Sequence, residues 1–146
     1  MFITTSDNIK LNVKKTGTGK VVLFVHEFGG DQRSWKPQVS YFSRRYECIT
    51  FNARGYPPSD VPKSIDSYSQ ERAVEDIYDV MNELSIDKAH IVGLSMGGFA
   101  ALHFGIKYPK KTISLTIAGS GYGAEKNHED YFRRLSSDVA NQFIKL

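Results

Sequence analysis

The sequence contains a single cysteine, Cys48, and no apolar run long enough to span a membrane. One cysteine cannot form an internal disulfide, and its place in the run ECITFN is typical of a small buried thiol in a reducing compartment. The opening segment MFITTSDNIKLNVKK lacks the basic and continuous apolar regions of a signal peptide. We therefore expect a cytoplasmic protein without a membrane partner.

An excess of charge of one sign is also absent. Nineteen Lys and Arg residues stand against sixteen Asp and Glu, which gives a formal net charge of +3. The basic residues are dispersed in short pairs that are typical of solvated loops and helix ends, unlike a nucleic-acid-binding surface. We expect no nucleic-acid partner, no cofactor and no bound metal.

The chain does contain an alternation of strand-like and helix-like segments after an antiparallel hairpin at its start. The run VVLFV, with its β-branched residues, is typical of a strand buried on both faces of a parallel sheet. Strands are expected at 21–25, 47–52, 89–94 and 112–118, with helices at 34–45, from a capping box at 67–70 to Leu84, and at 96–108. The pattern predicts one α/β domain with a mostly parallel sheet flanked by helices and functional residues at the carboxyl ends of its strands.

The motif Gly93-Leu94-Ser95-Met96-Gly97 lies between an expected strand and an expected helix. A serine that stands clear of the sheet at such a sharp turn has a strained backbone, and side chains two residues away would clash. Glycine at 93 and 97 removes those Cβ atoms, and Gly98 lets the new helix pack against the sheet. The context predicts that Ser95 is a nucleophile.

The same turn places Ser95 at a helix N-terminus, where free N–H groups favour developing negative charge. The Met96 N–H is the expected first oxyanion donor. The second is expected from the loop His26-Glu27-Phe28-Gly29-Gly30, with the Phe28 N–H as the candidate. Met96 and Phe28 are therefore also expected to contact the substrate.

The segments LFVHEFGGDQRSW, FNARGYPPSDVP and HIVGLSMGGFAALHFGIKYP resemble the α/β-hydrolase family, in particular its small serine esterases, enol-lactonases and haloperoxidase-like members. The resemblance implies that Ser95 is acylated, that Phe28 donates an oxyanion N–H and that His26 and Gly29 have structural parts. One departure is Glu27, which stands where the family carries glycine. An acidic side chain pointing inward would oppose the oxyanion, so an outward orientation is expected.

A serine needs a histidine base and an acid, which in this fold follow the nucleophile in the order Ser, acid, His. The resemblance implies that both lie beyond residue 146. His103 is two helical turns from Ser95, His90 begins the strand at the opposite end, and His26 belongs to the oxyanion loop. A makeshift triad with His128 stays open, because Glu129 and Asp130 adjoin it.

The chain is accordingly expected to be the N-terminal part, residues 1–146, of a single α/β-hydrolase domain, truncated after about the sixth strand, with 124–146 as the start of a cap. The strand 112–118 would then present an open apolar edge through which the chain could self-associate or form a homodimer. Whether the chain is a natural short form or a fragment stays open.

Two functions are therefore weighed. In the first, Ser95 attacks a small carboxylic ester or lactone and forms an acyl-enzyme, although the chain by itself is incomplete. In the second, the fold is a non-catalytic module that binds a small apolar ligand or assembles with another chain. A dinucleotide-binding function is disfavoured because neither glycine-rich loop reads G-x-G-x-x-G with a ribose-binding acid at the expected distance.

Overall fold

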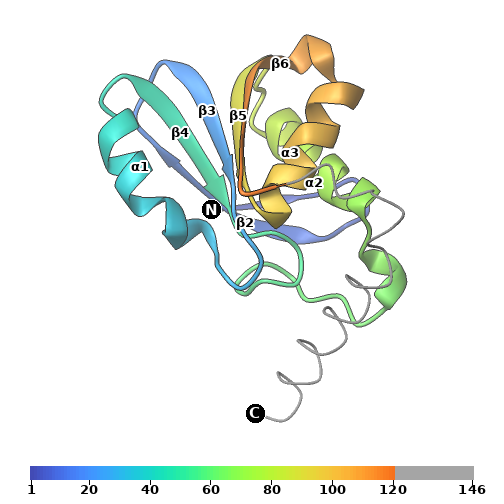
Figure 1. The fold of residues 1–146 in the computed structure, drawn as a ribbon. Helices are drawn as coiled ribbons and strands as arrows, with labels where there is room; N and C mark the ends of the chain where they lie inside the picture. The colour runs from blue at the N-terminus through green and yellow to red at the C-terminus, as the bar shows by residue number, and fades with distance from the viewer. Residues whose placement is uncertain (121–146) are drawn as a thin grey trace.

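The computed structural model describes residues 1–120, which form one sheet with helices on both faces (Figure 1). The strand order is β1-β2-β4-β3-β5-β6, with antiparallel β1/β2 and β2/β4 pairs and parallel pairing from β4 to β6. The strands are β1 Phe2–Thr4, β2 Lys10–Thr16, β3 Lys20–Val25, β4 Tyr46–Phe51, β5 Ala89–Leu94 and β6 Thr112–Ala118. The expected mostly parallel α/β sheet is confirmed.

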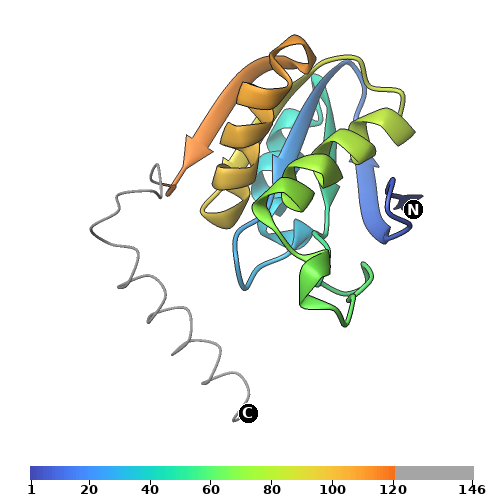
Figure 2. The same cartoon turned by 90° about the vertical axis from the view of Figure 1, so that its right-hand side faces the viewer.

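Helix α1 (Lys36–Phe42) covers one face of the sheet, and α2 (Gln70–Glu83) and α3 (Met96–Lys107) lie side by side on the other (Figures 1 and 2). Short 3-10 turns precede α1 and α2 and follow α3, at Gln32–Trp35, Ile65–Ser67 and Pro109–Lys111. Because β3, β4 and β5 run parallel, the segments that leave their carboxyl ends meet at one edge of the sheet.

Two helix starts differ from the sequence-based expectation. The helix expected over 34–45 is divided into a 3-10 turn and the shorter α1, which carries Pro37 in its first turn, where the missing N–H is not needed. The expected capping box at 67–70 is wrong, because Ser67 ends a 3-10 turn. Ser69 is the N-cap of α2, and its hydroxyl accepts the Arg72 N–H at 3.0 Å.

The core is split by the sheet into a large and a small cluster. Alternate residues of β3 and β4, such as Leu23 and Ile49, pack with α2 and α3 residues such as Ile77 and Phe104. The opposite residues of these strands pack with Trp35 in the smaller cluster on the α1 face. Each fully buried apolar side chain stabilises the fold by about 1.5–3 kcal/mol. The packed core on both faces therefore fixes the strands whose carboxyl ends carry the loops.

Strand β6 lies at an edge of the sheet within residues 1–120 and has exposed apolar side chains, Ile113 and Leu115. The self-association expected from this edge stays a prediction. No helix in the described part of the chain is long and apolar enough to cross a membrane.

Candidate active site

Ser95 lies at the bend between β5 and α3 and has the unusual backbone angles φ 51° and ψ −116°. A non-glycine residue in this conformation costs on the order of 1–3 kcal/mol, so the surroundings must enforce it. The Ser95 N–H donates to the Ala118 carbonyl at 2.8 Å, and the Ser95 carbonyl accepts from the Gly98 N–H at 2.9 Å and the Ser120 hydroxyl at 2.6 Å. These bonds fix both peptide groups of the bend.

The glycines around Ser95 are required by close backbone contact. A Cβ atom on Gly93 would overlap the Gly97 carbonyl, and one on Gly97 would overlap the carbonyls of Val25 and His26. Backbone cannot move aside as a flexible side chain can, so neither position accepts a larger residue without displacing the bend. At Gly98 the obstacle is the Ser120 hydroxyl, which belongs to a side chain.

The half-buried Ser95 side chain is left free by this geometry. Ser95 is the N-cap residue of α3, yet its hydroxyl makes no capping hydrogen bond, unlike that of Ser69 on α2. The first N–H groups of a helix have no partner within the helix and carry the positive end of its dipole. Met96 is the first residue of α3, so its N–H belongs to this set.

The loop after β3 is held by His26, which is buried. Its Nε2 accepts the Ala53 N–H at 3.0 Å, so Nδ1 carries the proton and donates to the Glu27 carbonyl at 2.8 Å. Burial lowers the pKa of His26 and keeps the ring neutral. Both ring nitrogens are engaged, and His26 joins the loop after β3 to the loop after β4.

Glu27 is turned toward the first 3-10 turn. Its Oε1 accepts the Ser34 hydroxyl at 2.8 Å, and its side chain lies against Gly30 and does not line the pocket described below. Gly29 has φ +79°, a conformation that favours glycine, and a Cβ there would meet no other atom. Gly29 is thus required for its backbone conformation and not for space.

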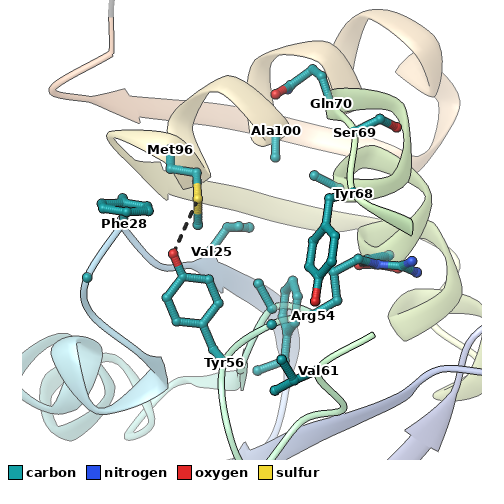
Figure 3. A pocket seen from close by; sticks show the side chains of 17 residues that line it. Val25, Phe28, Arg54, Tyr56, Val61, Tyr68, Ser69, Gln70, Met96 and Ala100 are labelled. Atoms are coloured by element: carbon teal, nitrogen blue, oxygen red, sulfur yellow. Dashed lines mark hydrogen bonds and ion pairs between the residues drawn. The ribbon is translucent and has the colours of Figure 1, made fainter. Parts of the chain in front are cut away.

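A pocket of about 720 Å³ opens at this edge of the sheet, with Phe28 and Met96 at one end and Val61 and Tyr68 at the other (Figure 3). The Tyr56 hydroxyl points to Met96 Sδ, 3.7 Å away, and the Tyr56 ring packs edge-on against His26 with centroids 4.7 Å apart. Burial raises the pKa of the Tyr56 phenol, which therefore stays protonated. The loop after β3, the loop after β4 and the segment that leads into α2 are far apart in the sequence and meet in this pocket.

A cluster of ion pairs is centred on the buried Arg54, whose partner Asp76 is buried and whose partner Asp7 is exposed. Its guanidinium forms a paired contact with Asp76 on α2, at 2.8 and 2.7 Å, and another with Asp7, at 2.9 and 3.0 Å. Burial opposes the charged form, but the hydrogen bonds to Asp76 and Asp7 raise the pKa of Arg54 above its ordinary value. The cluster anchors the start of the loop after β4 to α2.

Three carboxylates, those of Asp7, Asp76 and Asp79, lie close enough together to suggest a cation site. The guanidinium of Arg72 lies 3.3 Å from Asp7 and 3.5 Å from Asp79, and Arg54 pairs with Asp7 and Asp76. Each of these carboxylates therefore lies beside at least one arginine guanidinium, which disfavours a cation at this position.

The other histidines of residues 1–120 are engaged elsewhere. His90 contacts the Ser114 hydroxyl at 2.8 Å at the start of β5, and His103 contacts Gln70 at 3.1 Å on the exposed surface of α3. Among the described residues, no side chain hydrogen-bonds the Ser95 hydroxyl. His128 and the cap expected at 124–146 lie outside the described residues.

The Arg54 cluster and the position of Tyr56 were not predicted from the sequence. A signal was present, because Asp76 and Asp79 lie on the same side of α2 as the apolar stripe at Ala73, Ile77 and Val80. Carboxylates on a buried face need cationic partners, and Arg54 directly follows a buried strand.

A parallel sheet flanked by helices, with a strained serine between β5 and α3, defines the α/β-hydrolase class. The chain belongs to this family: the family model described as "alpha/beta hydrolase fold" matches residues 20–143.

Among curated proteins, the chain is similar to 3-oxoadipate enol-lactonase 1 of Acinetobacter baylyi, with 34% identity over 82% of this chain and 45% of that protein. It is also similar to epoxide hydrolase 1 of Caenorhabditis elegans, with 36% identity over 73% of this chain and 27% of the relative. The chain spans less than half the length of these relatives.

Solved structures give the same class. An epoxide hydrolase of Bacillus megaterium, solved with its diol product, superposes with a TM-score of 0.76 at 27% identity over 79% of this chain and 40% of that chain. An enol-lactonase of Burkholderia xenovorans superposes with a TM-score of 0.77 at 22% identity, over 82% of this chain and 46% of that one, which shows the common fold.

Proposed function

We propose that this chain carries the nucleophile half of a serine hydrolase that acts on a small carboxylic ester or lactone. The observation that carries the proposal is the uncapped Ser95 hydroxyl at the strained bend between β5 and α3. The bend places Ser95 at the N-terminus of α3, and the next two residues, Met96 and Gly97, line the pocket together with Phe28.

In the proposed reaction, the Ser95 oxygen attacks the carbonyl carbon while a base takes its proton. The N–H groups of Met96 and Phe28 receive the charge on the carbonyl oxygen. The alcohol leaves with a proton from the protonated base, and water then releases the acid from the acyl-enzyme. The base and its acid partner have to come from outside residues 1–120, and we propose that 124–146 begins a cap over the pocket.

An epoxide is the second candidate substrate, because several relatives are named epoxide hydrolases. The identity of residue 95 favours an ester or lactone. Attack of a serine oxygen on an epoxide carbon leaves an ether, which has no carbonyl that water can attack, whereas an acylated serine has one. Turnover of an epoxide at Ser95 would therefore stop after one cycle.

A fluorophosphonate probe tests the nucleophile directly. Labelling of the intact chain is expected at Ser95 and should be lost in Ser95→Ala. Ser85→Ala is the matched control, because Ser85 is exposed and also has a positive φ, 55°, but lies at the end of α2. Labelling that survives Ser95→Ala would contradict the proposal.

A non-catalytic binding module is the alternative, and one observation favours it: no described side chain hydrogen-bonds the Ser95 hydroxyl. Under this alternative Ser95 is not activated, and the probe labels the intact chain no faster than Ser95→Ala. Ligand binding in the pocket would then be retained without covalent reaction.

A further inference from the structure

The pocket wall contains a cation that has no hydrogen-bond donor left to offer. Of the described residues that line the pocket, Arg54 alone is cationic. A guanidinium has five N–H donors. In Arg54, Nε donates to Asp76, Nη1 to Asp7 and the Ser67 carbonyl at 2.8 Å, and Nη2 to Asp7 and Asp76. All five donors are used, so Arg54 cannot bind an incoming carboxylate without breaking a bond to its own partners.

The charge around Arg54 also disfavours an anion. The cluster contains the guanidinium groups of Arg54 and Arg72 and the carboxylates of Asp7, Asp76 and Asp79, which formally leaves one negative charge in excess. Burial raises the pKa of Asp76, and its paired hydrogen bonds with Arg54 favour the ionised form. The hydrogen bonds from Arg54 hold the pKa of Asp7 well below its usual range, so this carboxylate stays ionised. A second anion placed beside this cluster would be repelled.

The remainder of the wall is mostly apolar. Phe28, Val61, Met96 and Ala100 face the cavity, and Tyr56 directs its hydroxyl to Met96 (Figure 3). A volume of about 720 Å³ is within the range of small-molecule sites. The part of the wall formed by residues 1–120 is mostly apolar and has no free cation, so it gains free energy from an apolar group and imposes a desolvation cost on an unpaired charge.

We propose that the part of the pocket formed by residues 1–120 selects a neutral substrate with an apolar or aromatic group and disfavours substrates that carry a carboxylate on that group. The proposal rests on the proposed function in taking this pocket as the substrate site, and it adds the substrate's charge. The name of the enol-lactonase relative refers to 3-oxoadipate, a dicarboxylate. The proposal therefore expects this chain to prefer a substrate of different charge.

The test compares two probes of equal shape, 4-phenylbutanamide and 4-phenylbutanoate, titrated into the intact isotope-labelled chain at millimolar concentration and neutral pH. The amide is expected to shift the NMR signals of Tyr56, Val61 and Ala73, which line the pocket, with a dissociation constant at least about tenfold below that of the carboxylate. Equal or tighter binding of the carboxylate, or no shift of pocket signals by the amide, would overturn the proposal.

Substitution of Val61 by lysine adds a free cation to the part of the pocket wall formed by residues 1–120. Val61 is exposed and lines the pocket, so Val61→Lys is expected to fold and to bring the affinity for the carboxylate up to or above that for the amide. Val61→Met has a similar length without the charge and should keep the preference for the amide. A Val61→Lys variant that still discriminates against the carboxylate by tenfold would contradict the electrostatic explanation.

Fluorophosphonate labelling of the same samples separates the two proposals. Labelled Ser95 with equal binding of both probes would leave the nucleophile in place and remove the charge selection. Preference for the amide without labelling would keep the charge selection and remove the hydrolase activity.

Discussion

The elbow wall of the pocket, residues 93–98, is held by backbone packing, whereas the loop wall, residues 53–62, is held by buried charges. In the elbow wall, glycines at 93 and 97 let carbonyl groups approach so closely that no Cβ fits. In the loop wall, Arg54 makes five hydrogen bonds to two carboxylates and a carbonyl. His26 lies between the two walls and bonds to the loop wall through Ala53.

The difference follows from what each wall has to do. A nucleophile must be presented with little positional freedom, and backbone contact provides this without side-chain rotamers. The loop wall carries three prolines, and its far end is bonded to β2 through Ser59 and Asp60. Its beginning is joined to α2 by the long side chain of Arg54. The elbow wall should therefore be sensitive to substitutions that add side-chain volume, and the loop wall to substitutions that remove a charge.

The largest expected effect is on the loop wall. Arg54→Met keeps the length of the side chain but leaves Asp76 buried without its partner, which should lower the free energy of unfolding by about 3–5 kcal/mol. Chemical denaturation measures the loss. Arg33→Met is the control, because Arg33 pairs with Asp31 on the surface with its side chain 88% exposed, and its midpoint should hardly move. Equal losses in both variants would show that burial of the pair is irrelevant.

An intermediate effect is expected on the elbow wall. Gly97→Ala places a Cβ against the Val25 carbonyl, which should cost about 1–3 kcal/mol and displace Ser95, with loss of fluorophosphonate labelling. In Gly105→Ala on the same helix, the nearest atoms to the new Cβ belong to the side chain of Leu115, which can move, and labelling should stay intact. The explanation fails if Gly97→Ala is labelled as fast as the unmodified chain.

The smallest effect is expected at His26, between the walls. Its folded-state pKa lies below the ordinary value, so the unfolded chain takes up the proton first as the pH falls below about 6.5. Protonation of Nε2 removes the bond from the Ala53 N–H, a net contribution of about 1 kcal/mol. The contribution of His26 to the free energy of unfolding is therefore fully present above about pH 6.5. It is lost as the pH falls from there through the lower pKa of the folded state.

Denaturation midpoints measured between pH 7 and pH 5 check this dependence. His26→Asn should be less stable at neutral pH and show a flatter profile over this interval. His103→Asn, on the exposed surface of α3, should keep the decline. A decline that persists unchanged in His26→Asn would assign it to another group.

Much of the framework could be predicted from the sequence because its signals are local. The strands expected at 21–25, 89–94 and 112–118 agree with β3, β5 and β6 to within one residue, since each segment is rich in apolar and β-branched residues. The glycines around Ser95 indicated the sharp bend before any contact was known. The start of α2 was misplaced because two serines, Ser67 and Ser69, offer the same capping chemistry, and only the extended backbone at Ser69 decides between them.

The pocket could not be predicted in the same way. Asp7, Arg54 and Asp76 are separated by more than twenty residues at each step, and nothing local assigns them to one another. The Tyr56 hydroxyl meets Met96 only because the carboxyl ends of parallel strands share one edge of the sheet.

The sequence by itself determined the class of fold, the position of the bend and the residue at its apex, because periodicity and glycine spacing act over a few neighbouring residues. The tertiary structure alone decided that Arg54 has no free donor and that the pocket wall, as far as residues 1–120 form it, lacks an available cation. The physical reason is that the use of a hydrogen-bond donor depends on which distant groups the packed sheet and helices bring within 3 Å of it.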